Sequence, residues 1–173
     1  MDWMQQLGGV LSRYADGRAD HTQADSDFDH IAQGAPRDAI GRGLADAFRS
    51  SQTAPFGDML GQLFGQSAGT QRAGVLNALV TTLGPVVVSR MLAQRNATAA
   101  KRIEAGEPVS PDIAAQIPPE DVKALATEAE RKDPSIIDRL GHFYADQPAL
   151  IKGLGGAALV VAMAKIAQAQ TRG

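Results

Sequence analysis

The sequence predicts an all-α protein, a multihelical bundle built around two apolar central helices and without a sheet. Apolar residues recur at the three- and four-residue spacing of helices along most of the chain, and no segment alternates with period two over a useful length. Aromatic residues make up only 5% of the 173 residues while hydrophobic residues make up 44%, so the apolar content is mostly aliphatic, which suits close-packed helices. Residues 73–89 and 153–164 contain no charged side chain and are apolar on every side, as expected for helices at the centre of a bundle.

A chain of this length is predicted to form a single domain, residues 1–173, with a core large enough to fold without disulfides. Cysteine is absent, which excludes a disulfide framework, a thiolate metal site and a cysteine nucleophile. Along the chain we expect N-terminal helices in 1–50 with a polar loop at 16–30, central helices in 54–93, a connector containing Pro and Gly in 94–118, and C-terminal helices in 119–170.

The N-terminal part predicts three helices. In residues 2–14 the apolar side chains share one helical face. Residues 16–30 are polar and rich in turn formers, so we expect a solvated loop, near whose end Asp25 or Ser26 caps a short second helix. Pro36 suits the start of the third helix, because its ring sets the helical φ and its missing N–H is not needed there.

The central part predicts two helices and a break. Pro55 opens the first, and the second runs through residues 73–89. Pro85 lies inside the second helical pattern, cannot donate to the helical ladder and clashes with the preceding turn, so we expect a kink or a break there. The connector that follows is predicted to contain one short helical piece.

The C-terminal part predicts three helical starts, at Pro119, at Asp133 and at Pro148. The last helix includes the apolar run 153–164, whose twelve residues suit a core helix and are too few to span a bilayer. We interpret the small residues of this run as a surface that a neighbouring helix approaches closely, since glycine lacks a Cβ. The same interpretation applies to glycines elsewhere in the chain, and the full set is Gly153, Gly155, Gly156, Gly41, Gly43, Gly8 and Gly9.

The apolar helices also predict the core. The side chains expected to be among the most buried come from both uncharged stretches, and they are Leu76, Leu79, Leu83, Leu154, Ala158 and Val161.

The net charge of −2 conceals an uneven distribution of charge. Residues 61–102 carry no acidic side chain and five basic ones, Arg72, Arg90, Arg95, Lys101 and Arg102. We interpret this segment as a buried helix whose basic ends meet acidic neighbours. Direct binding of nucleic acid is not expected, because the segment lacks interleaved aromatic residues and the isoelectric point of the chain is about 5.9.

The residues around Asp25 partly match the pattern of a calcium-binding loop. Asp25, Asp27 and Asp29 imitate the start of a calcium loop, but the sixth position is His30 instead of glycine and the twelfth is Pro36 instead of glutamate. A site formed by His21, His30 and these aspartates is the alternative, although no ligand pair has the tight spacing of a zinc motif. The sequence therefore predicts no metal-binding residue.

His142 lies near Ser135 and Asp138 in the sequence, and all three residue types occur in hydrolase triads. A triad is defined by geometry, however, and proximity along one helix does not create it. We interpret His142 as a half-buried side chain that packs on the last helix. The sequence thus predicts no catalytic residue, no cofactor-binding residue and no cofactor, and no small-molecule substrate is evident.

Residues 56–65, which read FGDMLGQLFG, are followed by the uncharged helix and by residues 109–118, which read VSPDIAAQIP. This combination of Gly- and Leu-rich helix starts with a serine-to-glutamine connector resembles the YidB-like family of bacterial proteins, over about residues 56–125. The resemblance implies a multihelical fold. It implies no known activity and supplies no catalytic residues.

These observations favour a non-enzymatic bacterial helical protein that acts through protein–protein interaction or self-association. The alternative is a membrane-active protein that inserts the apolar stretches 73–89 and 153–164, because both have uncharged centres and basic flanks. An enzyme whose site is assembled from residues distant in sequence is a third hypothesis. Cytoplasmic localisation is the default expectation, since the sequence has neither a signal-peptide pattern nor about 20 consecutive apolar residues.

Overall fold

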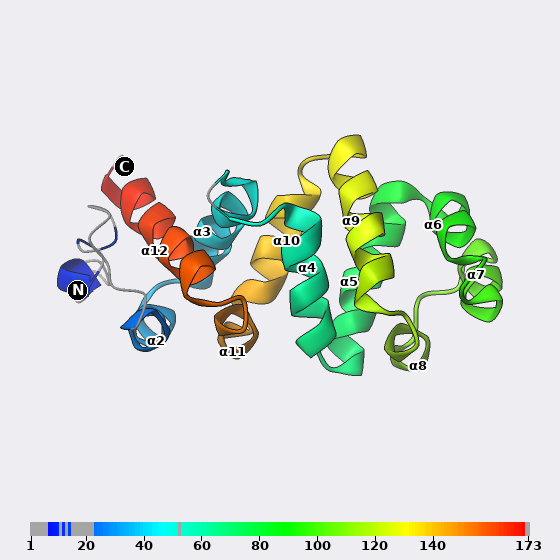
Figure 1. Ribbon diagram of the computed structural model, residues 1–173, viewed down its shortest axis with the longest axis horizontal. Helices are drawn as coiled ribbons and strands as arrows, with labels where there is room; N and C mark the ends of the chain where they lie inside the picture. Colours follow the sequence, from blue (N-terminus) through cyan, green and yellow to red (C-terminus); the bar gives the residue numbers. More distant parts are fainter. Residues whose placement is uncertain (1–6, 11, 13, 15–22, 52, 172–173) are drawn as a thin grey trace. The chain divides into compact units, whose positions relative to one another are not determined.

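A computed structural model describes residues 7–10, 12, 14, 23–51 and 53–171, and these form helices joined by turns, with no strand among them (Figure 1). The all-α prediction is confirmed. The described helices pack as two compact units. The terminal unit comprises the described residues of Met1–Pro55 and Ile137–Gly173, and the central unit is Phe56–Ile136.

In the terminal unit, segments from the two ends of the chain pack together. Residues 7–10, 12 and 14 are helical, and the helices that follow are α2 (Ala24–Gly34), α3 (Arg37–Arg49), α10 (Ile136–Ala145), α11 (Pro148–Lys152) and α12 (Gly156–Thr171). Helix α12 packs against α3 and α2, and α11 packs against α2 and α12. The fully buried side chains at the centre of this unit include Tyr14, Phe28, Ile31, Ile40, Leu44, Tyr144 and Leu159.

The prediction of a polar loop at 16–30 is wrong for the second half of this range, which forms the first turns of α2. Ala24 and Phe28 lie on the buried face of this helix, and that burial stabilises a helix that the polar composition alone disfavours. Asp27 is buried as well, where its carboxylate accepts a 2.5 Å hydrogen bond from the Tyr14 hydroxyl. Residues 16–22 of the predicted loop lie outside the described residues.

Glycines on α3 bring its backbone close to two other helices. A methyl group on Gly41 would lie 3.0 Å from the Cα atom of His142 on α10, and one on Gly43 would lie 3.0 Å from the Ala162 carbonyl oxygen on α12. The interpretation of these two glycines as close-approach sites is confirmed. For Gly8 and Gly9 no described neighbour lies within 4 Å of the corresponding methyl positions.

The apolar run 153–164 is not one continuous helix. Helix α11 ends at Lys152, and Gly155 has a φ of 98°, a left-handed conformation that suits glycine, before α12 begins. Gly155 therefore ends a turn, and no described neighbour lies within 4 Å of the position that a methyl group on it would take. Leu154 and Ala158 are only half-buried, so their assignment to the core is wrong, whereas Val161 is buried as expected.

The central unit is arranged around α5. Its helices are α4 (Phe56–Gln66), α5 (Gly69–Leu83), α6 (Pro85–Leu92), α7 (Ala97–Glu104), α8 (Pro111–Ala115) and α9 (Pro119–Lys132). Helix α5 packs against α4, α6, α8 and α9. Leu76 and Leu79 are fully buried and Leu83 nearly so, which confirms their place in the core. The two apolar stretches thus belong to different units, with α5 in the central unit and α12 in the terminal unit.

Pro85 ends the first part of the apolar stretch, as predicted. Gly84 has a φ of 90°, and the axes of α5 and α6 on either side of it form a bend of 117°. Among the described helices none is both long and apolar enough to cross a membrane by itself, and only α5 and α6 taken together across this bend meet the length and composition of a span.

The connector 94–118 contains two helices, α7 and α8, where one short piece was predicted. Asn96 and Ser110 explain the starts of these helices, because each side chain accepts a hydrogen bond from a backbone N–H in the first turn. Asn77 on α5 holds the segment between them. Its amide oxygen accepts from the Val109 N–H at 2.8 Å, and its amide nitrogen donates to the Val109 carbonyl at 3.2 Å.

The FGDMLGQLFG segment forms α4, and its regularly spaced glycines face α9. A methyl group on Gly57 would lie 2.9 Å from the Lys123 carbonyl oxygen, and one on Gly61 would lie 3.2 Å from the Pro119 carbonyl oxygen. The spacing of four residues places these glycines on one side of the helix. The motif that carries the family resemblance is therefore a packing surface between α4 and α9.

Candidate functional site

The five basic side chains of the acid-free segment 61–102 have different environments. Arg72 closes the C-terminal end of α4, where its guanidinium donates to the carbonyls of Phe64, Gly65 and Ser67 and lies 5.1 Å from the centre of the Phe64 ring. Arg95 forms a 3.2 Å ion pair with Asp121 at the start of α9. The remaining bases, Arg90, Lys101 and Arg102, are exposed and form no ion pair with another described residue.

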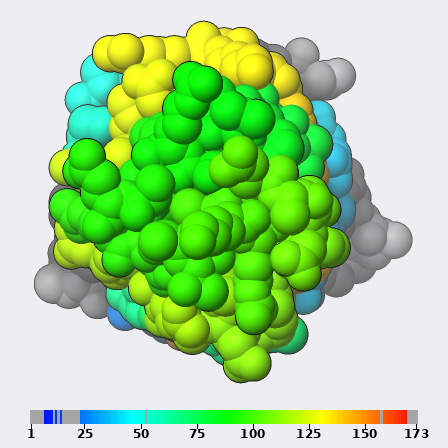
Figure 2. All heavy atoms as spheres, turned by 90° about the vertical axis from the view of Figure 1, so that its right-hand side faces the viewer, coloured from blue at the N-terminus to red at the C-terminus, as the bar shows by residue number. Residues whose placement is uncertain are grey.

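Helix α6 presents apolar side chains to solvent. Its inner side is formed by Val88, Ser89 and Leu92, which are buried. On the outer side Val86 is 49% exposed and Val87 is 38% exposed, and these are the large apolar side chains that the described part of the chain leaves exposed. Figure 2 looks onto the face of the central unit that α6 and α7, in green, dominate. Exposed neighbouring apolar side chains of this size are a common feature of interaction surfaces.

A groove of about 360 Å³ lies between α6 and α9, and Val87 is one of the residues that line it. Val87 and Met91 supply its apolar lining, and Arg90 and Glu128 supply its charges. Arg90 has no ionic partner among the described residues. Glu128 pairs only with Arg131 on its own helix, at 3.5 Å and with both side chains well exposed, an interaction worth little in water. The groove thus offers an apolar surface, a free cation and a weakly engaged carboxylate.

A second depression, of about 300 Å³, lies between α4 and α9 above the glycines of α4. Two of its charged side chains neutralise each other, since Lys123 forms a 2.5 Å ion pair with Asp58, and the third, Glu120, also lines the depression. Its shape follows from the missing side chains of Gly61 and Gly65, which line it. This depression is therefore a consequence of helix packing.

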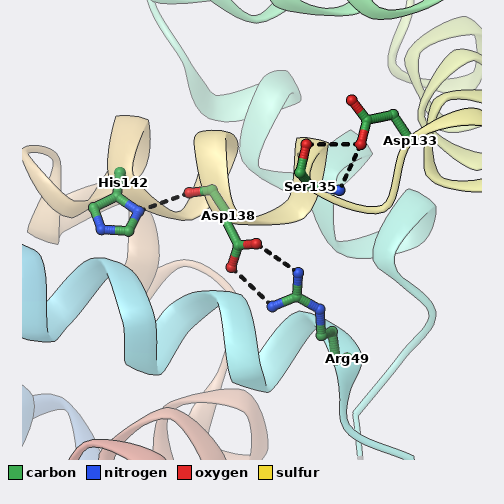
Figure 3. Close-up of polar contacts among 5 residues, drawn as sticks. All are labelled: Arg49, Asp133, Ser135, Asp138 and His142. Carbon is green, nitrogen blue, oxygen red and sulfur yellow. Dashed lines mark hydrogen bonds and ion pairs between the residues drawn. The ribbon is translucent and has the colours of Figure 1, made fainter.

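Ser135, Asp138 and His142 do not form a triad (Figure 3). The Ser135 hydroxyl donates to the Asp133 carboxylate at 2.7 Å. The Nδ1 atom of His142 lies 2.8 Å from the Asp138 carbonyl oxygen, and its Nε2 atom lies 3.0 Å from a carboxylate oxygen of Asp38 on α3. Both imidazole nitrogens therefore already have acceptor partners, and neither is available to take a proton from a serine.

The Asp138 carboxylate accepts two hydrogen bonds from the Arg49 guanidinium at the end of α3 (Figure 3). These contacts change the acidity of the groups involved. The pKa of Asp138 is lowered, mainly by the hydrogen bond from Arg49, and the pKa of Asp38 is lowered by hydrogen bonds from His142 and then Arg42. The pKa of His142 is raised, first by the Asp138 carbonyl and then by the Asp38 carboxylate. Sequence reasoning missed this cluster, because its partners lie 89 and 104 residues apart.

The aspartates that imitate a calcium loop lie on helix α2, and two of them have other partners. Asp27 accepts from Tyr14, and Asp29 forms a 2.8 Å ion pair with Lys152, which raises the pKa of that lysine. His30 Nδ1 lies 3.0 Å from the Ser26 carbonyl. Within the described ranges no group of three His, Cys, Asp or Glu side chains could hold a metal ion. His21 lies outside those ranges.

No protein-family model, no curated protein and no solved structure matches this chain. The resemblance to the YidB-like family remains a prediction from residues 56–125.

Proposed function

We propose that this protein is non-enzymatic and acts by binding protein, that its contact surface is the groove between α6 and α9, and that a second copy of the chain occupies this surface. The observation that carries the proposal is the exposure of Val86 and Val87 on α6, together with a groove whose apolar lining is Val87 and Met91. Covering these side chains removes apolar area from water, which favours association.

The charges of the groove support a second copy as the occupant. In a two-fold symmetric dimer both copies use the same surface. If one residue of the first copy contacts a second residue of the other copy, the reciprocal contact forms as well. Arg90 and Glu128 stand on the two sides of one apolar groove. An antiparallel approach of two such grooves brings Arg90 of one copy to Glu128 of the other, twice, while the valines of both copies cover each other.

The groove and the exposed area of two valines are small, so the association is expected to be weak. Interfaces below about 1,200 Å² are typical of transient complexes. Sedimentation velocity from about 1 µM to about 1 mM covers the corresponding range of affinity. The expected result is a sedimentation coefficient that rises with concentration toward that of a dimer.

Charge reversal tests the surface directly. Arg90→Glu and Glu128→Arg should each weaken the dimer, because each places like charges opposite one another. The double variant restores two opposite-charge pairs and should recover dimerisation. Lys101→Glu is the matched control, since Lys101 is an exposed cation on α7 that does not line the groove, and it should leave association unchanged. A wild-type chain that stays monomeric throughout the range contradicts the proposal.

Membrane activity is the second candidate, favoured by the length and composition of α5 and α6 taken together. Insertion would require the central unit to open, because Leu76 and Leu79 are fully buried in it. Flotation with vesicles of phosphatidylcholine, with and without phosphatidylglycerol, distinguishes the candidates. Recovery of the protein in the vesicle fraction, together with a monomeric state in solution, would place membrane binding first.

A further inference from the structure

The contact between α3 and α10 is bordered by three charged pairs. Arg49 binds Asp138, Asp38 binds His142, and Arg37 lies 3.4 Å from Asp146, just beyond the end of α10. Because residue numbers rise along α3 as they fall along α10, these pairs follow two antiparallel helices.

Glycines bring the two backbones together between these pairs. A methyl group on Gly141 would lie 2.7 Å from the Gly41 carbonyl oxygen, and one on Gly41 would lie 2.8 Å from an edge carbon of the His142 ring. The imidazole therefore rests directly on the backbone of α3, and its position depends on how closely α10 approaches.

His142 is surrounded by acceptors on both sides of its ring. Nδ1 faces the Asp138 carbonyl at 2.8 Å, and Nε2 faces the Asp38 carboxylate at 3.0 Å. A neutral imidazole has one N–H donor and one lone-pair acceptor, whereas the imidazolium has two donors. Only the protonated ring can donate in both contacts. Loss of the proton places a nitrogen lone pair against one of the two oxygens, and that contact becomes repulsive.

The other charges near the ring change the stability of the imidazolium, but the protonated form remains favoured. On α3, Asp38 favours the imidazolium, and Arg42, which pairs with the same carboxylate, opposes it. On α10, the Asp138 carboxylate favours the imidazolium and is itself neutralised by Arg49. The raised pKa of His142 agrees with a balance in favour of the charged form.

We propose that His142 is a pH-sensitive clamp, which holds α10 against α3 while its ring is protonated and loosens this contact when the ring loses its proton. The pKa of the folded state lies above that of an unfolded histidine, so the stabilisation is complete below the unfolded value of about 6.5 and is lost as pH rises through the folded value. The ring is partly open to water, which screens the interaction. The expected response is therefore a local loosening of α10 and not unfolding of the chain.

Hydrogen exchange of the full-length protein measures this response. Exchange rates of the α10 amides, corrected for the intrinsic pH dependence of exchange, are compared at about pH 6 and about pH 8, on either side of the histidine range. The protection of α10 should fall several-fold at the higher pH, while the protection of α5 in the central unit should change little.

Two variants and a control assign the effect to the clamp. His142→Gln cannot titrate and should make the protection of α10 independent of pH. Asp38→Asn removes the carboxylate that faces Nε2 and should move the transition to lower pH. His30→Gln is the matched control, because His30 also contacts a backbone carbonyl four residues before it, and it should leave the pH dependence intact. Wild-type protection that does not change with pH, or a pH dependence that survives in His142→Gln, overturns the proposal.

Discussion

Arg49 and Asp138 form a two-point ion pair, in which Nη1 donates to Oδ1 at 2.9 Å and Nη2 donates to Oδ2 at 2.8 Å. This fork geometry is specific to arginine, because lysine carries a single ammonium group. The pair joins the last residue of α3 to the first turn of α10, across 89 residues of sequence.

Arg49→Lys should lower the free energy of unfolding by about 0.5–1 kcal/mol, because one of the two hydrogen bonds is lost and the pair is partly exposed to water. Urea denaturation measures the change. Arg42→Lys is the control, since Arg42 pairs with Asp38 on its own helix and forms no ion pair with a second helix among the described residues. An equal loss in both variants would show that the fork between the helices adds nothing.

Leu79→Ala should destabilise the protein by about 2–5 kcal/mol, because Leu79 is fully buried on the central helix α5 and its truncation leaves a cavity. The exposed Val86 nearby in the sequence provides the comparison, and Val86→Ala should change the free energy of unfolding by less than about 0.5 kcal/mol. Denaturant unfolding followed by circular dichroism gives both values. A small effect of Leu79→Ala would contradict the central position of α5.

Gly43→Ala should cost about 1–3 kcal/mol, because the new methyl group would overlap the Ile166 side chain and approach the Ala162 carbonyl on α12. Gly8→Ala makes the same chemical change in a helical residue with open space around it. It should stabilise the protein by up to about 1 kcal/mol, through the higher helix propensity of alanine. Opposite signs of the two changes in melting temperature are the expected result, and equal signs would contradict the close packing of α3 and α12.

Asn77→Ala should cost about 1–3 kcal/mol, because it leaves the partly buried N–H and carbonyl of Val109 without their side-chain partners. Asn77→Asp separates the two contacts, since it keeps the acceptor for the Val109 N–H and replaces the donor by a charged oxygen. Hydrogen exchange at the Val109 amide should therefore accelerate in Asn77→Ala more than in Asn77→Asp. An unchanged exchange rate of the Val109 amide in both variants would show that the Asn77 side chain does not fix the position of the connector.

Much of the fold could be predicted because helix formation has a local, repeating signature. The spacing of Leu76, Leu79 and Leu83 indicated the buried face of α5, and Pro85 indicated its end. The same reasoning failed where a local sequence pattern is compatible with two different structures. Small apolar residues occur both within packed helices and in turns, and only the φ of Gly155 shows that residues 153–155 end one helix before another begins.

The candidate sites depended on information that no local pattern contains. Val86 and Val87 have the same residue type as the buried Val88, and which of them faces solvent follows from the 117° bend that sets the direction of α6. The partners of Asp138 and His142 lie on α3, far away in sequence. Periodicity thus determined the helical segments with a strong apolar repeat, such as α5, and their apolar side, but not the first turns of α2 or the second helix of the connector. The tertiary structure alone decided which helices meet, because packing energy depends on the fit between surfaces that are distant along the chain.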